Sequence, residues 1–596
     1  MAPSIQYQNR LNELIDSQKK LQQKKSVFGL LRFGSIAAIV AAFYFLRPLG
    51  LIYVFSASAA LLAIFITLIY KDLANRSALR HIGHLINITN EEIKALQGEY
   101  FQFADGTEYT PKVHSYASDL DIFGYASIYQ FINRTTSDMG AATLASWLSE
   151  PAPAKMIIER QDAVKELAEK IYWRQDIRAF GTETNIRQST YDKLKVWMQE
   201  PTVFLQFNHW KWLRVLLPVI IVGVVVAAIA GLIPMKIMYA LLLLYALIAY
   251  QVNKAVSPMH DKLSRIVDEM NALSESIGLI EKEKFGAVLN RRLQQLFITT
   301  EGSASVKISR LKKILDRLDI RYNIVMSPPL NILLLWDLQQ ALDLEKWKKE
   351  HAADIENWFD TLGVFEALNS IATIHFNNPG WCFPVLHNEH FFMEAKELGH
   401  PLIPVSKRVN NHIQIDKRGI VMLVTGSNMA GKSTYLRSIG VNTVLAMAGA
   451  PVCAVTFTIS PVQLLSSMRI SDNLEESTST FYAELKKLKA IIDKVNAGEK
   501  VFILLDEILR GTNSLDRHTG SVALIKQLIQ HKASAIIATH DLALADIIKT
   551  FPDHIQNFHF DVQINNEELY FDYKLKTGVC TSLNASILMK KIGIEL

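Results

Sequence analysis

A glycine-rich loop that carries a lysine and a hydroxyl side chain constrains the fold of this chain more than any other feature. The loop has the form G-x-x-x-x-G-K-[ST] and runs from Gly426 to Ser433. Residues 421–425 before it have the pattern of a buried strand, and residues 434–446 after it have the pattern of a helix. This order predicts a site in which backbone N–H groups at a helix N-terminus surround phosphate groups.

The side chains of the loop favour a nucleoside triphosphate over a chance glycine turn. Lys432 supplies a positive charge for the β- and γ-phosphates, and Ser433 supplies a hydroxyl for Mg²⁺. The residues expected to surround the nucleotide are Gly426, Ser427, Asn428, Met429, Ala430, Gly431, Lys432, Ser433 and Thr434.

Two further apolar runs end in polar side chains. Residues 501–505 are followed by Asp506 and Glu507, and residues 535–538 lead to His540. Parallel strands would deliver these side chains to the carboxyl edge of one sheet. There Asp506 would hold Mg²⁺, Glu507 would position the attacking water, and His540 would sense the γ-phosphate. Each run alone has an ordinary reading, an acidic turn or a strand-capping histidine, but together with the loop they predict a hydrolytic site with Glu507, Lys432 and His540 as catalytic residues.

These segments resemble the MutS proteins of DNA mismatch repair. Residues 425–434 are similar to that family's T-G-P-N-M-G-G-K-S-T, with Ser427 and Ala430 as departures. Residues 505–514 resemble its L-D-E-I-G-R-G-T-S-T, residues 538–540 its A-T-H, and residues 479–484 its S-T-F-x-x-E. The similarity extends over roughly residues 119–596, with one interruption.

The resemblance implies an ATPase that uses ATP and Mg²⁺, works as a homodimer and acts on DNA. It also implies that Ser479 reaches the nucleotide held by the opposite subunit. The family places an aromatic side chain on the adenine, but residues 407–411 contain none. Either Arg408 stacks on the base instead or the base is held loosely. The family's N-terminal mismatch-reading domain has no counterpart in the similarity.

Four apolar runs are unusual for that family, namely residues 28–46, 51–70, 215–233 and 237–250. Residues 51–70 contain no charge, and twenty such residues are about enough to cross a bilayer. Arg32 lies near the start of the first run, where a long side chain can snorkel to the interface. Residues 237–250 are short for a span and would be tilted, re-entrant or buried. A soluble core is the alternative, but aliphatic runs paired around tight turns favour two membrane hairpins.

Basic residues flank the first two runs on their outer sides: Lys19, Lys20, Lys24, Lys25, Lys71, Arg76 and Arg80. Positive charge marks the cytoplasmic side, so the sequence predicts a multi-pass cell-membrane protein with its ATPase domain in the cytoplasm. The three cysteines have no metal-like spacing, and we expect no structural metal.

The predicted architecture is multidomain, with transmembrane helices, an α-helical core and lever domain, and a C-terminal α/β phosphate-loop ATPase of ABC type. The expected segments are 1–26 (amphipathic helix), 27–70 (hairpin), 71–118 (connector), 119–210 (lever, first part), 211–252 (hairpin), 253–350 (lever, second part) and 351–596 (ATPase).

Three functions remain open at this stage. The first is a membrane-tethered DNA-binding ATPase, and the second is a transporter-like protein, although the ABC signature L-S-G-G-Q is absent. The third is a scaffold whose nucleotide site only sets dimerisation. Basic residues at 291–292 and 310–317 would either contact DNA phosphates or form a solvated face.

Overall fold

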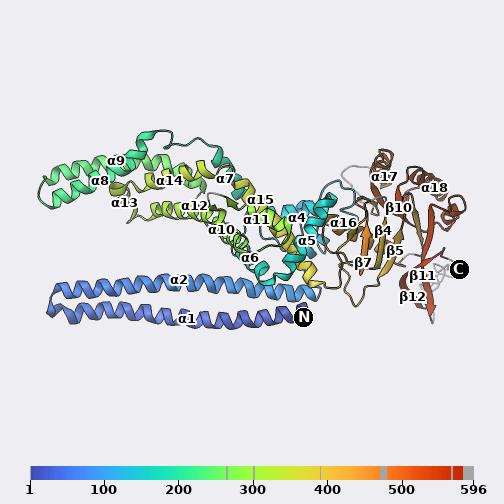
Figure 1. Ribbon diagram of the computed structural model, residues 1–596, viewed down its shortest axis with the longest axis horizontal. Coiled ribbons are helices and arrows are strands. Elements are labelled where there is room, and N and C mark those ends of the chain that lie inside the picture. The colour runs from blue at the N-terminus through green and yellow to red at the C-terminus, as the bar shows by residue number, and fades with distance from the viewer. Residues whose placement is uncertain are drawn as a thin grey trace.

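The computed structural model describes residues 2–263, 266–299, 302–388, 391–427, 429–469, 480–565 and 568–580, and it is mostly helical with its main sheets in the C-terminal part (Figure 1). The helices are α1 (Pro3–Leu46), α2 (Leu51–Leu96), α3 (Ile128–Ile132), α4 (Asp138–Ser149), α5 (Ala154–Glu169), α6 (Ile171–Glu183), α7 (Gln188–Gln199), α8 (Asn208–Ile229), α9 (Met235–Leu263), α10 (Val267–Lys282), α11 (Val288–Gln295), α12 (Ala304–Leu318), α13 (Ser327–Leu334), α14 (Trp336–His351), α15 (Ile355–Asn377), α16 (Lys432–Ala448), α17 (Thr480–Asn496) and α18 (Ser514–Gln530). The strands are β1 (Ile298–Thr299), β2 (Gly302–Ser303), β3 (Val385–Leu386), β4 (Met393–Leu398), β5 (Asn411–Ile415), β6 (Val421–Thr425), β7 (Thr456–Ile459), β8 (Gln463–Ser467), β9 (Val501–Asp506), β10 (Ser534–Thr539), β11 (Ile555–Asn565) and β12 (Glu568–Thr577).

The first hairpin consists of α1 and α2, joined by a short 3₁₀ turn, Arg47–Leu49. The polar start of the chain and the apolar run after it form one continuous helix, so the expected segment boundary at residue 26 is not a break in the structure. In the same way α2 continues from the apolar run into the predicted connector. Backbone hydrogen bonds close within a helix whatever the side chains face, so a change of polarity along the chain does not end it.

The second hairpin consists of α8 and α9. The run 237–250 looked short for a span, but it belongs to the 29-residue helix α9, which continues past the apolar residues into a polar section. Four helices, α1, α2, α8 and α9, are long and apolar enough to cross a membrane by length and composition. The described residues contain no other helix of this kind.

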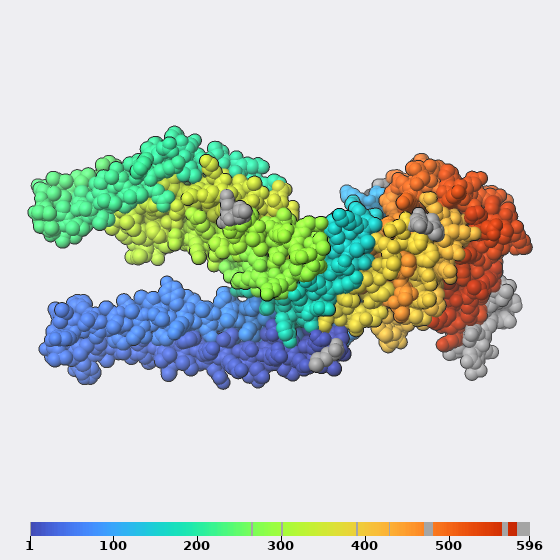
Figure 2. Space-filling view, viewed as in Figure 1, coloured from blue at the N-terminus to red at the C-terminus, as the bar shows by residue number. Residues whose placement is uncertain are grey.

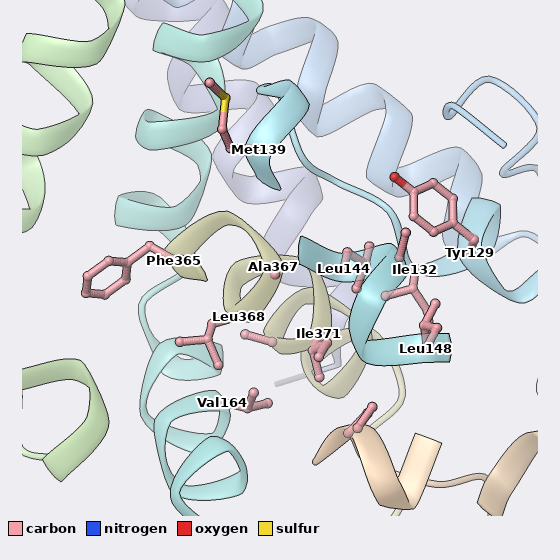
Figure 3. Close-up of a cluster of buried hydrophobic side chains, with 14 of the residues drawn as sticks. Tyr129, Ile132, Met139, Leu144, Leu148, Val164, Phe365, Ala367, Leu368 and Ile371 are labelled. Atoms are coloured by element: carbon pink, nitrogen blue, oxygen red, sulfur yellow. The ribbon is translucent and has the colours of Figure 1, made fainter. Parts of the chain in front are cut away.

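The core of the helical part surrounds α15, which packs between α4 and α5 (Figure 3). Phe365, Leu368 and Ile371 of α15 are buried in the same hydrophobic cluster as Leu144 of α4 and Val164 of α5. Because α15 ends just before the first strands of the C-terminal part, it connects the helical arms to the sheets.

The C-terminal part contains two sheets, of six and four strands. The larger has the order β12-β11-β6-β10-β9-β8, with all neighbours parallel except β12, which pairs antiparallel with β11. The smaller has the order β3-β7-β4-β5. Every residue of β6, β9 and β10 is buried, which agrees with the apolar sequences of these strands.

Buried polar contacts attach the first hairpin to the helical core. The Tyr7 hydroxyl donates to Asn377 Oδ1 at 3.0 Å, and the Tyr7 ring meets Phe376 edge-on. Glu92 of α2 is buried and accepts from Arg134 Nε at 2.6 Å and from Arg178 Nη1 at 2.9 Å. Both helices of the first hairpin are therefore fixed to the same core that holds α15.

The two hairpins extend in the same direction from the core, and their tips lie at the same end of the molecule, opposite the sheets (Figure 1). Figure 2 shows the two arms separated from each other along their outer halves. Where they converge, a polar cavity of about 480 Å³ lies between α2, α6, α10 and α12.

Candidate functional site

Three parallel strands end together at the edge of the large sheet where the candidate site lies. In the register of β6 with β10, Thr425 lies opposite Thr539. In the register of β10 with β9, Ala538 lies opposite Asp506. Glu507 follows β9 directly, and its backbone N–H donates to the carbonyl of Ala538 at 2.9 Å. The sheet thus brings the glycine-rich loop, the acidic pair and the end of β10 to one edge.

The glycine-rich loop passes close to the last two strands of the sheet. Gly426 has a φ of 150°, and a Cβ atom there would lie 2.9 Å from the backbone oxygen of Phe560. Gly431 has a φ of 102°, and a Cβ atom there would lie 3.0 Å from the ring of Tyr573. Glycine adopts these φ values without a steric cost, so it lets the backbone close around the N-terminus of α16. The first N–H groups of a helix have no partner within the helix, which suits this position to an anion.

Lys432 is the first residue of α16, and its side chain is folded over its own loop. Its Nζ donates to the carbonyl oxygens of Gly426 and Ser427, each at 2.9 Å, and lies 3.4 Å from His540 Nε2. Burial lowers the pKa of this amino group, while the carboxylates of Glu507 and Asp506 act in the opposite direction. The ammonium group is thus held by the carbonyl oxygens of its own loop.

Glu507 lies between the side chains of His540 and Arg510. His540 Nε2 is 2.5 Å from its Oε1, and Arg510 Nε is 3.0 Å from its Oε2. The hydrogen bond from His540 is the main reason that the pKa of Glu507 lies below its usual value. The backbone of Glu507 has a φ of 49°, a left-handed conformation that is uncommon outside glycine and often found where a side chain must be aimed. Glu507 is therefore an ionised carboxylate at neutral pH.

Asp506 ends β9 and is buried. The Ser433 hydroxyl donates to its carboxylate, whereas Oδ1 has no hydrogen-bond partner among the described residues. Burial is the main cause that raises the pKa of Asp506. A buried carboxylate oxygen without a partner, next to a serine hydroxyl, fits the oxygen ligands that Mg²⁺ prefers. The described residues contain no group of three or more His, Cys, Asp or Glu side chains placed to hold a metal ion. A Mg²⁺ ion here would need phosphate oxygens and water to complete its shell.

A pocket of about 410 Å³ opens beside the loop, and Met429, Ala430, Gly431, Lys432, Ser433 and Thr434 line it together with Glu507. Its other walls include Tyr573 of β12 and His400, which sequence reasoning missed. Burial lowers the pKa of His400 to about 4, so its ring is neutral at physiological pH. The signal for Tyr573 is that residues 571–578 resemble the final region of the MutS family, a likeness that assigns this tyrosine no role.

The remaining predicted residues fall elsewhere. Arg408 is not among the residues that line the pocket: its Nε donates to Asn410 Oδ1 at 3.2 Å, and its Cδ lies against Gly399. Asn428 and Ser479 lie outside the described residues. Arg408 therefore gains no support as the partner of a base, and the ring side chains that line this pocket are those of His400, Tyr435, Phe560 and Tyr573.

A buried glutamate supports the loop that follows Glu507. Glu484 of α17 accepts a hydrogen bond from the backbone N–H of Leu509, which has a φ of 59°. Glu484 is the final residue of the segment resembling S-T-F-x-x-E, and its burial raises the pKa of its carboxyl. It shapes the acidic loop without lining the pocket.

The helical part and the sheet meet at Asp119. This buried carboxylate accepts from Ser466 Oγ of β8 at 2.6 Å, from Lys487 Nζ of α17 at 2.6 Å and from the backbone N–H of Arg469 at 3.0 Å. The side chain of Arg469 pairs in turn with Asp121. The base of the helical part is thus tied to the end of β8 and to the helix that carries Glu484.

Comparison with known proteins gives a consistent picture for this part of the chain. The family model described as MutS domain V matches residues 422–590. The "MutS protein homolog 4" of Homo sapiens is 33% identical over 212 residues, which cover 34% of this chain and 22% of that protein. The "DNA mismatch repair protein MutS" of Persephonella marina is 30% identical over 238 residues, covering 39% of this chain and 27% of the relative.

A longer match includes the helical part. The "DNA mismatch repair protein MutS" of Chlorobium phaeovibrioides is 26% identical over 499 residues, which cover 76% of this chain and 55% of that protein. The chain therefore spans between about a fifth and just over half of the length of these relatives. The domain match, the named relatives and the motifs at the sheet edge agree that residues 422–590 resemble domain V of the MutS family.

Proposed function

We propose that this chain is a membrane-anchored ATPase of MutS type, in which a phosphate-loop ATPase domain at one end drives a switch between two copies. The observation that carries the ATPase assignment is the convergence of Lys432, Asp506, Glu507 and His540 at one sheet edge, beside a pocket lined by the glycine-rich loop. The loop, the acidic pair and His540 follow three separate strands, β6, β9 and β10, which makes a chance arrangement a poor explanation.

The residues divide the reaction between them. The N-terminus of α16 and Lys432 Nζ bind the phosphates, once Nζ leaves the carbonyls of Gly426 and Ser427. Asp506 and Ser433 would hold Mg²⁺, which when bound would neutralise charge on the phosphate oxygens. The ionised carboxylate of Glu507 orients the attacking water and accepts its proton. His540, already bonded to Glu507, lies where it can report the presence of the last phosphate.

The spacing of two ion pairs along the arms supports the membrane anchor. Arg32 lies 18 positions before Gly50 at the first tip, and Arg214 lies 18 positions before Leu232 at the second. Arg32 pairs with Asp72 at 3.1 Å, and Arg214 pairs with Asp343 at 3.0 Å. At the rise of an α-helix, 18 residues span about 27 Å, close to the thickness of a bilayer core.

The direction of the arms supports the same anchor. Both tips lie at one end of the molecule, so the two apolar lengths can enter one bilayer side by side (Figure 1). The ion pairs then mark the cytoplasmic boundary, and the nucleotide pocket faces the cytoplasm. The charge of Arg32 is paired with Asp72 of α2 at this boundary, so the arginine does not depend on reaching water by itself.

Homodimerisation and action on DNA are proposed from the family. The relatives are named for DNA mismatch repair, and we propose that this chain also binds DNA, duplex, mismatched or branched, through its arms. One observation favours a second candidate, an ATPase with a membrane task and no DNA substrate. The outer halves of both arms are apolar and exposed, which leaves them suited to lipid and poorly suited to phosphates.

The deciding experiment measures ATP hydrolysis by the full-length protein in nanodiscs, with Lys432→Ala as the blank. Homoduplex, mismatched and branched DNA are added in turn at low salt, where phosphate contacts are strongest. Stimulation by any of them supports the first candidate, and steady hydrolysis that ignores DNA supports the second. An intact protein that hydrolyses no more ATP than Lys432→Ala under all conditions contradicts the ATPase assignment.

A further inference from the structure

An exposed apolar corner lies on the second arm, where α12 turns back toward α14. It includes the end of a 3₁₀ turn, Asp319–Tyr322, the loop 323–326 and the start of α13. Ile324 is 89% exposed and Val325 77% exposed, and Tyr322, Met326, Pro328 and Pro329 are exposed as well. An apolar loop of this exposure is unusual on a surface that faces only water.

Contacts with α9 fix the height of this corner along the arm. On entry, Arg321 Nη2 donates to Ser257 Oγ at 2.6 Å. On exit, Asp337 accepts from Asn253 Nδ2 at 3.1 Å. Between these points α13 packs against both α8 and α9. Asn253 lies 18 positions after Met235, which is the level at which the apolar part of the second hairpin begins.

Figure 1 places α13 beside α8 and α9, closer to the tip of the arm than α12 and α14. The corner therefore begins beside His260, on the core side of the polar boundary, and runs toward the tip into α13, along the apolar surface of the second hairpin. A bilayer that surrounds the hairpin up to Arg214 and Asn253 would meet Ile324 and Val325 at its surface.

A stripe of unpaired positive charge leads to the corner. Arg310, Lys313 and Arg317 are exposed on α12 at the spacing that puts them on one face of a helix. Their side chains have no hydrogen-bond or ion-pair partner among the described residues. An apolar loop with arginine and lysine just behind it matches the profile of a bilayer surface, where lipid tails lie beneath anionic headgroups.

We propose that the corner, residues 322–329, inserts into the cytoplasmic leaflet of an anionic bilayer and that Arg310, Lys313 and Arg317 bind the lipid headgroups. This inference rests on the proposed membrane anchor and adds to it a third contact, made by the helical domain itself. Lipid then contacts the second arm at two places, the second hairpin and the corner. Changes in its angle relative to the membrane must pull the corner out or push it in.

Site-directed spin labelling of the full-length protein in nanodiscs tests this inference. Single cysteines replace Ile324 in the corner, Val219 in the second hairpin and Val306 at the start of α12, all exposed positions. The unsubstituted protein, with its native Cys382, Cys453 and Cys580, is carried through the same labelling to give the background. Discs contain phosphatidylcholine with or without phosphatidylglycerol. The accessibility of each label to oxygen is compared with its accessibility to a water-soluble nickel chelate. The ratio of the two reports whether the label lies in lipid or in water.

We expect the labels on Ile324→Cys and Val219→Cys to be severalfold more accessible to oxygen than to nickel, and the label on Val306→Cys to show the reverse. A lipid-exposed Val219 label with a water-exposed Ile324 label overturns the inference and leaves the membrane anchor intact. Water-exposed labels at all three positions overturn the anchor together with the inference.

A charge reversal tests the basic stripe. With Lys313→Glu and Arg317→Glu in the Ile324→Cys protein, we expect the label to move toward water in discs that contain phosphatidylglycerol. If the accessibility of the Ile324→Cys label does not change, the basic stripe does not bind lipid headgroups and that part of the proposal is overturned. DNA is the competing partner: a label on Lys313→Cys that responds to duplex DNA, while the Ile324 label stays in water, assigns the stripe to nucleic acid and overturns the inference.

Discussion

The central strands of the large sheet and the outer halves of the hairpins are both apolar, yet their surroundings are opposite. Every residue of β6, β9 and β10 is buried by other parts of the protein. In the most apolar window of each hairpin helix, only between 6% and 22% of the residues are buried. The sheet needs nothing outside the chain, whereas the hairpins expose a surface that only lipid or another apolar partner can cover. In the sequence the two cases differ in the length of the apolar run, which is five or six residues in each strand and about twenty in a run long enough to cross a bilayer.

The largest difference should appear when a charge is placed in each region. Leu504→Asp, at a fully buried position of β9, should cost about 5 kcal/mol or more and prevent folding, because the carboxylate loses water without gaining a partner. Leu62→Asp, half-exposed in α2, should leave the ATPase end folded and cost about 3 kcal/mol of membrane insertion. Thermal unfolding of the purified proteins and membrane flotation measure the two effects. If both variants lost folding equally, the proposal that protein covers the strands and lipid covers the hairpins would be contradicted.

A second prediction concerns chemistry at the sheet edge, where folding is left unchanged. Glu507→Gln removes the carboxylate that we propose accepts the proton of water, so hydrolysis should fall by about 100-fold or more while ATP still binds. Glu499→Gln, on an exposed turn at the other end of β9, serves as the matched control and should have no effect. Rapid-quench hydrolysis and equilibrium binding of ATP provide the two readouts. A Glu507→Gln enzyme of normal rate would show that another group positions the water.

A third prediction concerns the boundary of the first hairpin. Asp72 is 1% exposed and bonds Arg32 at 3.1 Å and Arg76 at 3.0 Å. Asp72→Asn should leave Arg32 and Arg76 without their anion and destabilise the hairpin by about 2 kcal/mol. The loss should be smaller than for a fully buried ion pair, because both arginines keep contact with solvent. Limited proteolysis in nanodiscs measures opening of the hairpin. Asp16→Asn, which breaks an exposed pair with Lys19, should change little.

The smallest predicted effect is a pH dependence of metal binding. Because burial raises the pKa of Asp506, protons should compete with Mg²⁺ at a pH above the usual aspartate range, and Mg²⁺ affinity should fall by up to about tenfold per pH unit below that pKa. The lowered pKa of Glu507 keeps its carboxylate ionised over the same range. Titration of Mg²⁺ against a fluorescent ATP analogue at several pH values gives the curve. The Glu507→Gln protein should follow the same curve, and a shift between the two would assign the titration to Glu507.

Local features of the site could be predicted from sequence because each depends on neighbouring residues. The strand at 421–425, the helix after the loop and the strand ending at Asp506 are all present, since their patterns are set within a few residues. Tyr573 could not be found in this way. It reaches the pocket only because β12 pairs with β11 and β11 with β6, a strand order that no local pattern encodes.

The arms show the same limit on a larger scale. Hydropathy locates the apolar runs, but not the length of the helices, which continue past the runs into polar sequence. The pairing of Arg32 with Asp72 joins residues 40 positions apart and depends on the hairpin turn between them. Sequence reasoning treated Arg32 as a single charge seeking water, and its true partner becomes visible only when α1 and α2 lie side by side.

The placement of both tips at the end opposite the nucleotide pocket has a consequence for how two copies would meet. If the tips are embedded in a membrane, every copy holds its pocket at the same height above the lipid and in the same upright orientation. Encounters then take place by sideways diffusion within a plane, and much of the orientational freedom that association normally removes is already lost. Confinement of this kind raises the effective concentration of one pocket near another without any added contact. A weak interface between ATPase domains would suffice, and the number of copies per unit of membrane area would control how often ATP joins two of them.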